Sequence, residues 1–417
     1  MSNAVEITGV NAWKVFDSRG KLTIEVGIRT RRGFGHAAAP SGASRGKWEV
    51  EQYPPEGIDQ AVKVVQSLLA PRLLGLAADD QVRIDTLLHE VDGTSTFSRI
   101  GGNTAYAVSY ATALAAADSR GVQLFEHLHR ENEVRLPLPL GNVLGGGRHA
   151  QGGRTDIQEF LVLPTGAHTF LEASSANAKV HSEVATQLAA KGKPPSGKGD
   201  EGAWIADLTT DEAFEIVSRA CKSVSASTGV NVEVGADVAA STLWDEKNKA
   251  YVYQKDRRRL DEGKQIDYMR SLAKDYRLAY LEDPFYEESF AAFRELTRSV
   301  DGTLVCGDDL FVTNLTRLQE GKKMRAGNAI IIKPNQVGTL TDARKTAEFA
   351  IQSSYVPVVS HRSGETPGSE LAHTAIAFAS PIIKTGVVGG ERVAKLNELI
   401  RIEGNLKERT RLARINR

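Results

Sequence analysis

A repeating pattern of short apolar runs, each closed by a polar residue, constrains the fold of this 417-residue chain more than any other feature. The pattern occupies the second half of the chain, and a stretch of helical character follows each run. The runs are Val232 to Asp237, Leu278 to Asp283, Thr303 to Asp309, Ala329 to Lys333, Val356 to His361 and Pro381 to Lys384. Continuously apolar strands that alternate with helices predict a parallel sheet buried on both faces.

The spacing of the closing residues fits one strand plus one helix. From Asp308 through Lys384 the closing residues are 25, 28 and 23 positions apart, and the interval of 45 from Asp237 to Glu282 has room for a long insertion. In a barrel of eight strands and helices, the carboxyl ends of the strands converge on one pocket. Helix caps and surface ion pairs could explain one such residue, but they explain six on a common period poorly. The residues expected in the pocket are Asp237, Glu282, Asp308, Lys333, His361 and Lys384.

The first third of the chain has a different pattern. Residues 24 to 28 alternate between apolar and polar with a period of 2, and Asp17-Ser18-Arg19-Gly20 separates them from an earlier run of the same kind. This predicts an antiparallel hairpin, with a third strand at residues 35–39 and helices at 59–74 and 103–117. The prolines at 137 and 139 mark a junction. We therefore predict an α/β chain in which an N-terminal α+β capping domain, residues 1–130, precedes a C-terminal (β/α)8 TIM-like barrel, residues 137–417.

Three of the expected pocket residues are carboxylates. Asp237, Glu282 and Asp308 would repel one another in a pocket, and each would resist ionisation. A bound divalent cation removes this conflict, and ligands that are all oxygen favour Mg²⁺ or Mn²⁺ over zinc. The sequence therefore predicts a magnesium site at this end of the barrel.

Two lysines close apolar runs and face the same pocket. A lone lysine is usually a solvated ammonium, but Lys333 follows Ile330-Ile331-Ile332, and Lys384 follows two isoleucines. Beside bound cations the neutral amine is favoured, so that a lysine can act as a general base on a proton next to a carboxylate. The segment His361-Arg362-Ser363-Gly364 offers donors that suit a phosphate.

The overall composition excludes several classes of protein. Lys and Arg together number 52, as do Asp and Glu, so the chain lacks the basic surplus of a nucleic-acid-binding protein. The two cysteines cannot form a disulfide framework, and no cysteine cluster has zinc spacing. We expect no signal peptide, because the N-terminal residues lack a basic region followed by an apolar one, and no apolar run approaches membrane-spanning length. We expect a cytoplasmic protein without nucleic-acid or membrane partners.

The motifs of the chain, taken in order, resemble the enolase family. The resemblance extends over nearly the whole chain, and many ordered motifs are far more specific than any one of them. The matching segments are residues 17–20 (DSRG), 40–44 (PSGAS), 158–160 (QEF), 199–202 (GDEG), 237–241 (DVAAS), 282–285 (EDPF), 308–310 (DDL), 333–336 (KPNQ), 360–366 (SHRSGET) and 384–386 (KTG). The barrel is accordingly expected to be of the enolase type.

The resemblance implies a reaction and a set of roles. The reaction is the Mg²⁺-dependent, reversible dehydration of 2-phospho-D-glycerate to phosphoenolpyruvate in glycolysis and gluconeogenesis, by a homodimer or a larger homo-oligomer. Lys333 would be the base and Glu201 the acid, with Glu159 beside it. Two Mg²⁺ per site are expected, the first on Asp237, Glu282 and Asp308 and the second assisted by Ser41. The substrate would be held by Lys384, Arg362, Ser363, His361 and His149.

Two alternatives stay open at the level of sequence. One is a homologue with a shifted substrate, which the loss of Arg362, Ser363 or the Ser41 loop would have favoured. The other is a non-catalytic homologue kept as a binding or scaffold protein, which would be expected to lose the base or the metal carboxylates. All of these residues are present. Small departures in the loops around His149 and Ala203 leave the second alternative in play.

Overall fold

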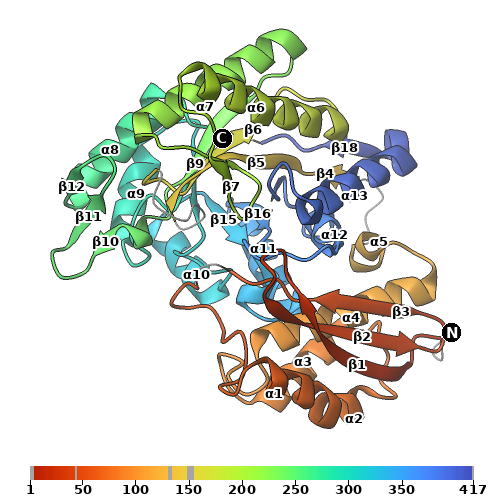
Figure 1. The fold of residues 1–417 in the computed structure, drawn as a ribbon. Coiled ribbons are helices and arrows are strands. Elements are labelled where there is room, and N and C mark those ends of the chain that lie inside the picture. Colours follow the sequence, from red (N-terminus) through yellow and green to blue (C-terminus); the bar gives the residue numbers. More distant parts are fainter. Residues whose placement is uncertain (1–3, 43–44, 130–133, 148–154, 416–417) are drawn as a thin grey trace.

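The computed structural model describes residues 4–42, 45–129, 134–147 and 155–415. An N-terminal α+β unit lies in the lower part of Figure 1, and a larger barrel surrounded by helices lies above it. This is the two-part α/β architecture that the sequence predicts. Among the described residues, no helix combines the length and the apolar character needed to cross a membrane.

The N-terminal unit is an antiparallel sheet with helices packed on one face. The predicted hairpin is β1 (Ile7–Phe16) and β2 (Leu22–Thr30), and β3 (Phe34–Ala38) pairs with β2. The helices are α1 (Ile58–Val64), a π-helical turn (Val65–Leu69), α2 (Ala70–Leu73), α3 (Gln81–Asp92), α4 (Gly102–Arg120) and α5 (Leu124–Leu128).

Helix α4 is almost wholly buried because the sheet lies directly against its backbone. A Cβ atom added at Gly35 of β3 would lie 2.3 Å from the backbone nitrogen of Ala115 and 2.4 Å from the carbonyl oxygen of Ala111. Only glycine permits so close an approach, and the many alanines of α4 serve the same purpose.

The barrel contains eight strands, closed by pairing of its last strand with its first. The strands in order are β5 (Leu138–Gly145), β6 (Glu159–Leu163), β9 (Glu233–Asp237), β13 (Tyr280–Glu282), β14 (Leu304–Gly307), β15 (Ala329–Ile332), β16 (Val356–Ser360) and β17 (Ile382–Lys384). All six strands predicted from the apolar runs are present. The sheet differs from a uniformly parallel barrel in one strand, since β6 runs antiparallel to both β5 and β9. Only 13 residues join β5 to β6, which is at the lower limit of the crossover that a parallel pair needs.

Helices cover the outside of the barrel. They are α6 (Phe170–Ala190), α7 (Thr210–Thr228), α8 (Glu262–Asp275), α9 (Phe290–Ser299), α10 (Leu315–Met324), α11 (Leu340–Gln352), α12 (Glu370–Ala377) and α13 (Gly390–Leu406). The insertion expected between residues 237 and 282 is a small sheet of β10 (Trp244–Asp245), β11 (Ala250–Tyr253) and β12 (Arg258–Leu260). Two further pairs are β7 (Gly197–Lys198) with β8 (Trp204–Ile205), and β4 (Val134–Leu136) with β18 (Thr410–Leu412).

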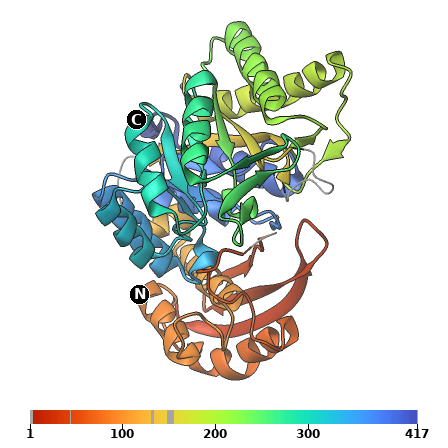
Figure 2. The ribbon, with the colours of Figure 1, turned by 90° about the vertical axis from the view of Figure 1, so that its left-hand side faces the viewer.

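The N-terminal unit packs against the barrel at the ends of strands β15 and β16. Figure 2 shows the unit below the barrel. Ser41 and Gly364 exchange two backbone hydrogen bonds of 2.7 and 2.8 Å, and the Asn335 side chain donates to the carbonyl of Pro40 over 3.0 Å. These contacts place the loop that follows β3 beside the carboxyl ends of the strands, where the predicted site lies.

Candidate functional site

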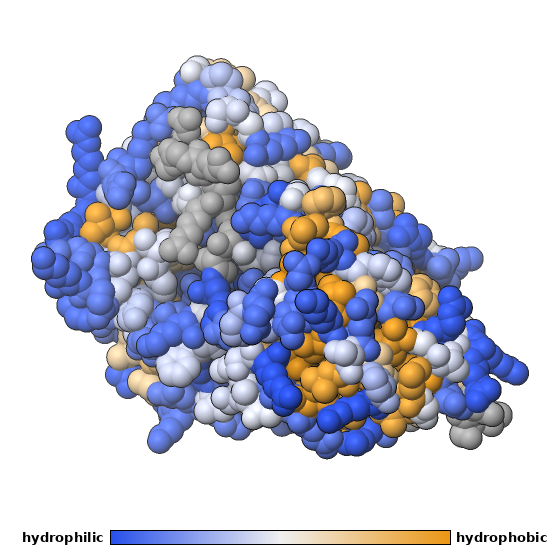
Figure 3. Space-filling model, turned by 60° about the horizontal axis from the view of Figure 1, so that its bottom comes forward, coloured by the Kyte–Doolittle hydropathy of each residue, from blue (hydrophilic) through white to orange (hydrophobic). Residues whose placement is uncertain are grey.

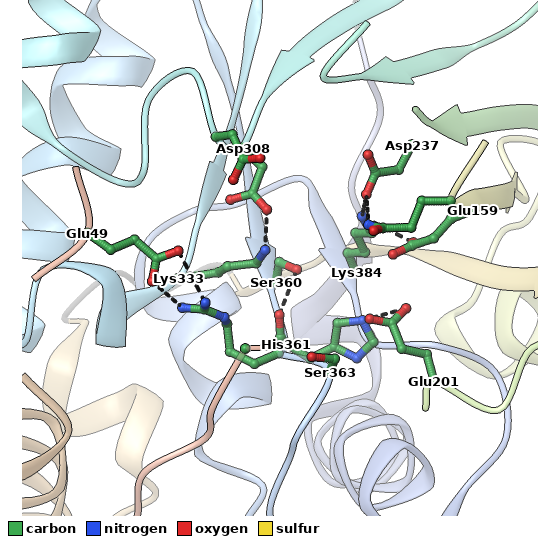
Figure 4. Close-up of a pocket in the computed structure, with 14 residues that line it drawn as sticks. Glu49, Glu159, Glu201, Asp237, Asp308, Lys333, Ser360, His361, Ser363 and Lys384 are labelled. Carbon is green, nitrogen blue, oxygen red and sulfur yellow. Dashed lines mark hydrogen bonds and ion pairs between the residues drawn. The ribbon is translucent and has the colours of Figure 1, made fainter. Parts of the chain in front are cut away.

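A narrow cavity of about 40 Å³ lies at the carboxyl ends of the barrel strands. Figure 4 shows polar side chains converging on it from several strands and from the N-terminal segment. Its lining includes nine of the predicted site residues, which are Glu159, Glu201, Asp237, Asp308, Lys333, His361, Arg362, Ser363 and Lys384. The sequence therefore predicted that these residues share one pocket. Their presence in the pocket does not by itself assign a role to any of them.

Strand register places three of the carboxylates in a row. Asp237 lies opposite Glu159 in the β6–β9 pair and opposite Glu282 in the β9–β13 pair. Asp237 and Glu282 end parallel strands, whereas Glu159 begins β6. Because β6 runs in the reverse direction, the start of that strand lies at the same end of the barrel as the finish of its neighbours. The antiparallel strand is thus the reason that Glu159 reaches the pocket.

Lys384 lies among these three carboxylates. Its Nζ atom is 3.2 Å from Glu159, 3.3 Å from Asp237 and 2.8 Å from Glu282. Burial favours a neutral amine, but the three carboxylates outweigh burial and raise the pKa of Lys384 well above its usual value. Burial and the neighbouring acids raise the pKa of Glu282 to about 7, and that of Asp237 is also raised. The single ammonium group of Lys384 therefore does not balance the negative charge of the three carboxylates around it.

Lys333 is ion-paired with Asp308 on the neighbouring strand end. The sequence argument expects a neutral amine here, beside bound cations. In the structure, burial does favour the neutral amine, but the Asp308 carboxylate outweighs it and raises the pKa of Lys333. Asp308 responds in the opposite sense, since the ammonium lowers its pKa despite burial. With Asp308 as its partner, Lys333 is held as the ammonium.

Asp308, one of the predicted metal ligands, also belongs to a second cluster of carboxylates. Among the described residues, oxygen atoms of Asp283, Asp308 and Asp309 approach one another within 4.8 Å, whereas Asp237 and Glu282 are paired with Lys384. The Asp283 carboxylate already accepts backbone N–H groups of Asp308 (3.0 Å) and Asp309 (2.7 Å). Asp283 thus fixes the turn that follows β14, which accounts for its position without an ion.

Glu201 and His361 face each other on another side of the cavity. His361 Nε2 lies 3.4 Å from the Glu201 carboxylate, to which Asn142 of β5 donates over 3.1 Å. Arg392 of α13 donates from Nη1 to His361 Nδ1 over 2.7 Å. An arginine can only donate, so His361 Nδ1 is the acceptor, and the hydrogen of the neutral ring is on Nε2 toward Glu201. Glu201 is therefore approached by two donors, which orient its carboxyl group toward His361 and Asn142.

Arg362 and Ser363 continue the strand end after His361. Both side chains are buried, and Arg362 donates to Glu49 and to the Asn335 side-chain oxygen. Burial disfavours the charge on Arg362, but the carboxylates of Glu49 and Asp308 outweigh burial and raise the pKa of Arg362. A buried, fully charged guanidinium at a cavity is suited to a dianionic group.

Two predicted residues do not join the pocket in the described structure. The Ser41 hydroxyl donates to Asp17 over 3.0 Å and accepts from Arg19 over 3.0 Å, and the neighbouring Gly42, rather than Ser41, lines the cavity. Glu282 lies behind Lys384 with no exposed surface. His149 lies outside the described residues.

Sequence reasoning missed several polar side chains that hold the site. Gln158 donates to Asp237 over 3.2 Å, and Gln336 donates to Asp308 over 2.9 Å. Both belong to motifs that the sequence singled out for their neighbours, Glu159 and Lys333. Glu49 and Arg392 had no comparable signal, because a charged residue in a loop or in an amphipathic helix is ordinarily solvated.

Comparison with known proteins completes the description. The model of the enolase C-terminal TIM barrel domain matches residues 133–416, and that of the enolase N-terminal domain matches residues 7–128. The enolase of Methanosphaera stadtmanae is 50% identical over 402 residues, covering 96% of this chain and 97% of that protein. Enolases of Methanothermobacter thermautotrophicus and Natronomonas pharaonis are 48% and 50% identical, over 95% and 96% of this chain and 96% and 99% of their own lengths.

Proposed function

The chain belongs to the enolase family, with the family's hydro-lyase activity, and we propose that the cavity at the strand ends is where it removes water from 2-phospho-D-glycerate. The observation that carries the proposal is that Lys333 and Glu201 line one cavity from different sides, as Figure 4 shows. Dehydration needs a base for the hydrogen on carbon 2 and an acid for the hydroxyl that leaves from carbon 3. Two separate groups on one cavity can meet both needs.

Lys333 is the proposed base. It directly follows the apolar strand β15, and its side chain is only 13% exposed, so its amine has a fixed place beside the substrate. Glu201 is the proposed acid, with Glu159 nearby on β6. The Nε2–H of His361 and the amide of Asn142 both point at the Glu201 carboxylate and orient it. The reverse reaction uses the same groups in exchanged roles.

The residues present suit magnesium. Asp237, Glu282 and Asp308 provide only oxygen ligands, and burial together with mutual repulsion raises the pKa of the first two. We propose that these three carboxylates hold the first Mg²⁺, and that the Ser41 loop contributes to a second. Bound there, magnesium supplies positive charge to the substrate carboxylate and favours the neutral amine of Lys333.

The remaining residues are assigned to substrate binding. Arg362 and Ser363 would hold the phosphate, and Lys384 would contact the substrate carboxylate once it is released from its acidic neighbours. A cavity of about 40 Å³ has room for a few water molecules only. Substrate binding therefore requires the paired lysine and carboxylate side chains to separate. His361 and His149 complete the proposed lining.

The proposed partner is a second copy of the chain. Trp13 and Phe34 lie on the outer face of the N-terminal sheet, 43% and 40% exposed, and both rings pack over Gly27. Figure 3 shows apolar side chains gathered on this side of the molecule. Sedimentation of the wild type and of Trp13→Glu would test the proposal, since losing an aromatic side chain that the dimer would bury should shift the protein toward monomer.

A cytoplasmic location is proposed as well, supported by the two buried free cysteines, Cys221 and Cys306.

The activity itself is tested by forming phosphoenolpyruvate from 2-phosphoglycerate with purified protein, with and without Mg²⁺. Magnesium-dependent formation of phosphoenolpyruvate supports the assignment. Binding of 2-phosphoglycerate without turnover under any metal condition would instead support the scaffold alternative. Turnover of a different carboxylate in preference to 2-phosphoglycerate would indicate a shifted substrate.

A further inference from the structure

Glu49 makes a two-point ion pair with the arginine proposed to bind phosphate. Arg362 donates from Nη1 to one carboxylate oxygen of Glu49 over 3.0 Å and from Nη2 to the other over 3.2 Å. Both side chains are buried. Figure 4 shows Glu49 reaching the cavity from the side of Lys333. Two parallel hydrogen bonds fix the plane of a guanidinium as well as its position.

The Glu49 carboxylate also has two other donors. It accepts the backbone N–H of Gly46 over 3.0 Å and the side-chain amide of Gln336 over 3.3 Å. The same amide nitrogen of Gln336 donates to Asp308 over 2.9 Å. Glu49 is thus bonded to its own loop, to Arg362 and, through Gln336, to a proposed metal ligand.

The orientation of the Gln336 amide is determined by Thr313. The Thr313 hydroxyl oxygen accepts the backbone N–H of Lys333 over 2.8 Å, and its own hydrogen is donated to Gln336 Oε1 over 2.6 Å. The oxygen of Gln336 therefore faces Thr313, and its NH₂ group faces the two carboxylates. This removes the ambiguity that an amide otherwise leaves, and it makes Glu49 and Asp308 genuine acceptors.

Two roles for Glu49 follow from these contacts. It could mimic the phosphate and leave when substrate binds, or it could stay and hold Arg362 in place. Departure would leave the buried Gly46 N–H without its acceptor and the Gln336 amide with Asp308 as its only carboxylate acceptor, and unpaired buried donors are costly. Asn335 holds Nη1 of Arg362 from a further direction, over 3.0 Å. The contacts therefore favour a carboxylate that stays.

We propose that Glu49 is a positioning residue that sets the guanidinium of Arg362 for the substrate phosphate and links it to the loop after β3. The inference rests on the proposed function, because it requires Arg362 to bind the phosphate. Glu49 has no part in the proton transfers. Its loss should therefore weaken binding of the phosphate group much more than it slows the bound substrate.

The test compares Glu49→Gln with Glu51→Gln. Glu51 lies two positions away on the same segment but pairs at the surface with Arg45. For Glu49→Gln we expect KM for 2-phosphoglycerate to rise about tenfold or more, inhibition by inorganic phosphate to weaken in parallel, and kcat to change far less. Glu51→Gln should match the wild type. Glu49→Asp retains the charge on a shorter stem and should recover part of the loss in KM.

Each outcome decides the matter. A lower KM in Glu49→Gln would show that Glu49 competes with phosphate, and an unchanged KM would show that it has no role; either result overturns the inference. If Glu49→Gln does not fold, the KM of Glu49→Asp decides by the same criteria. Arg362→Gln separates the two proposals: if phosphate inhibition is unaffected there, the proposed role of Arg362 fails first. If it is lost, adding Glu49→Gln to that variant should cause no further change in KM.

Discussion

Arg392 Nη1 lies 2.7 Å from Nδ1 of His361, and this contact determines which ring nitrogen of the histidine carries its hydrogen. Arg392 is fully buried in α13 and also donates to the carbonyl oxygens of Arg362 and Ser363. One arginine thus holds three consecutive residues of the site. Its charge also disfavours a second proton on His361.

The first prediction concerns the effect of pH on stability. Burial, aided by Arg392 and opposed by Glu201, lowers the pKa of His361 from 6.5 to about 4. Between these values the unfolded chain binds a proton that the folded chain does not, so stability rises with pH across this window and is lost as pH falls through it. His361→Gln should remove this contribution, about 3 kcal/mol between pH 7 and pH 4.

Urea unfolding at a series of pH values measures this difference. The wild type should lose more stability than His361→Gln on going from pH 7 to pH 4. The exposed His168 provides the control, and His168→Gln should follow the wild-type curve. Parallel curves for the wild type and His361→Gln would contradict the assigned neutral ring.

The second prediction concerns the base. Lys333→Ala should reduce turnover by roughly 10²- to 10⁴-fold, while 2-phosphoglycerate still binds, because the substrate's phosphate and carboxylate are held by other residues. Steady-state kinetics together with calorimetric binding provides the comparison. Lys345→Ala on α11, whose side chain is 59% exposed, is the matched control and should keep wild-type turnover. Substantial turnover in Lys333→Ala would reassign the base.

The location of the pocket was predictable from the sequence, because it depends on where the strands end. The ion pairs between the side chains inside the pocket were not predictable. An apolar run ending in Lys333 or Lys384 determines where the side chain emerges, whatever its partner. That Lys384 is paired with Glu282 and Asp237, while Lys333 is paired with Asp308, depends on the distances between side chains on different strands. No periodicity in the sequence encodes such distances.

The pattern of apolar runs likewise did not predict the direction of β6. Phe160 to Leu163 is an apolar run like the others, and Glu159 precedes it rather than closing it. That order is what an antiparallel strand requires if its glutamate is to reach the same end of the barrel. The order of Glu159 and the apolar run therefore indicates the strand direction, but it can be interpreted only once it is known at which end of the barrel the pocket lies. Glu49 offers no such signal, because its partner Arg362 is 313 positions away.

The third prediction separates the two acidic groups that share Asp308. If Asp237, Glu282 and Asp308 hold magnesium, Asp237→Asn should weaken Mg²⁺ binding by at least about tenfold, since a charged ligand is lost. Asp309→Asn should leave binding nearly unchanged. Calorimetric titration of the metal-free protein with Mg²⁺ measures both, independently of activity. Weaker Mg²⁺ binding in Asp309→Asn but not in Asp237→Asn would place the ion on the carboxylate cluster that contains Asp283.

Chelation should abolish turnover, and added Mg²⁺ should restore it.

The last prediction tests the close contact of the N-terminal sheet with α4. In Gly35→Ala the new methyl group would lie 2.3 Å from the backbone nitrogen of Ala115, and backbone atoms cannot move aside as a flexible side chain can. We expect the free energy of unfolding to fall by about 1–3 kcal/mol. Gly404→Ala is the matched control, because Gly404 lies at an exposed position of helix α13 with no atom within 4 Å of the added carbon. That variant should gain about 0.5–1 kcal/mol, since alanine favours the helix over glycine. Denaturant unfolding of both variants gives the comparison, and equal effects in the two would refute the steric explanation.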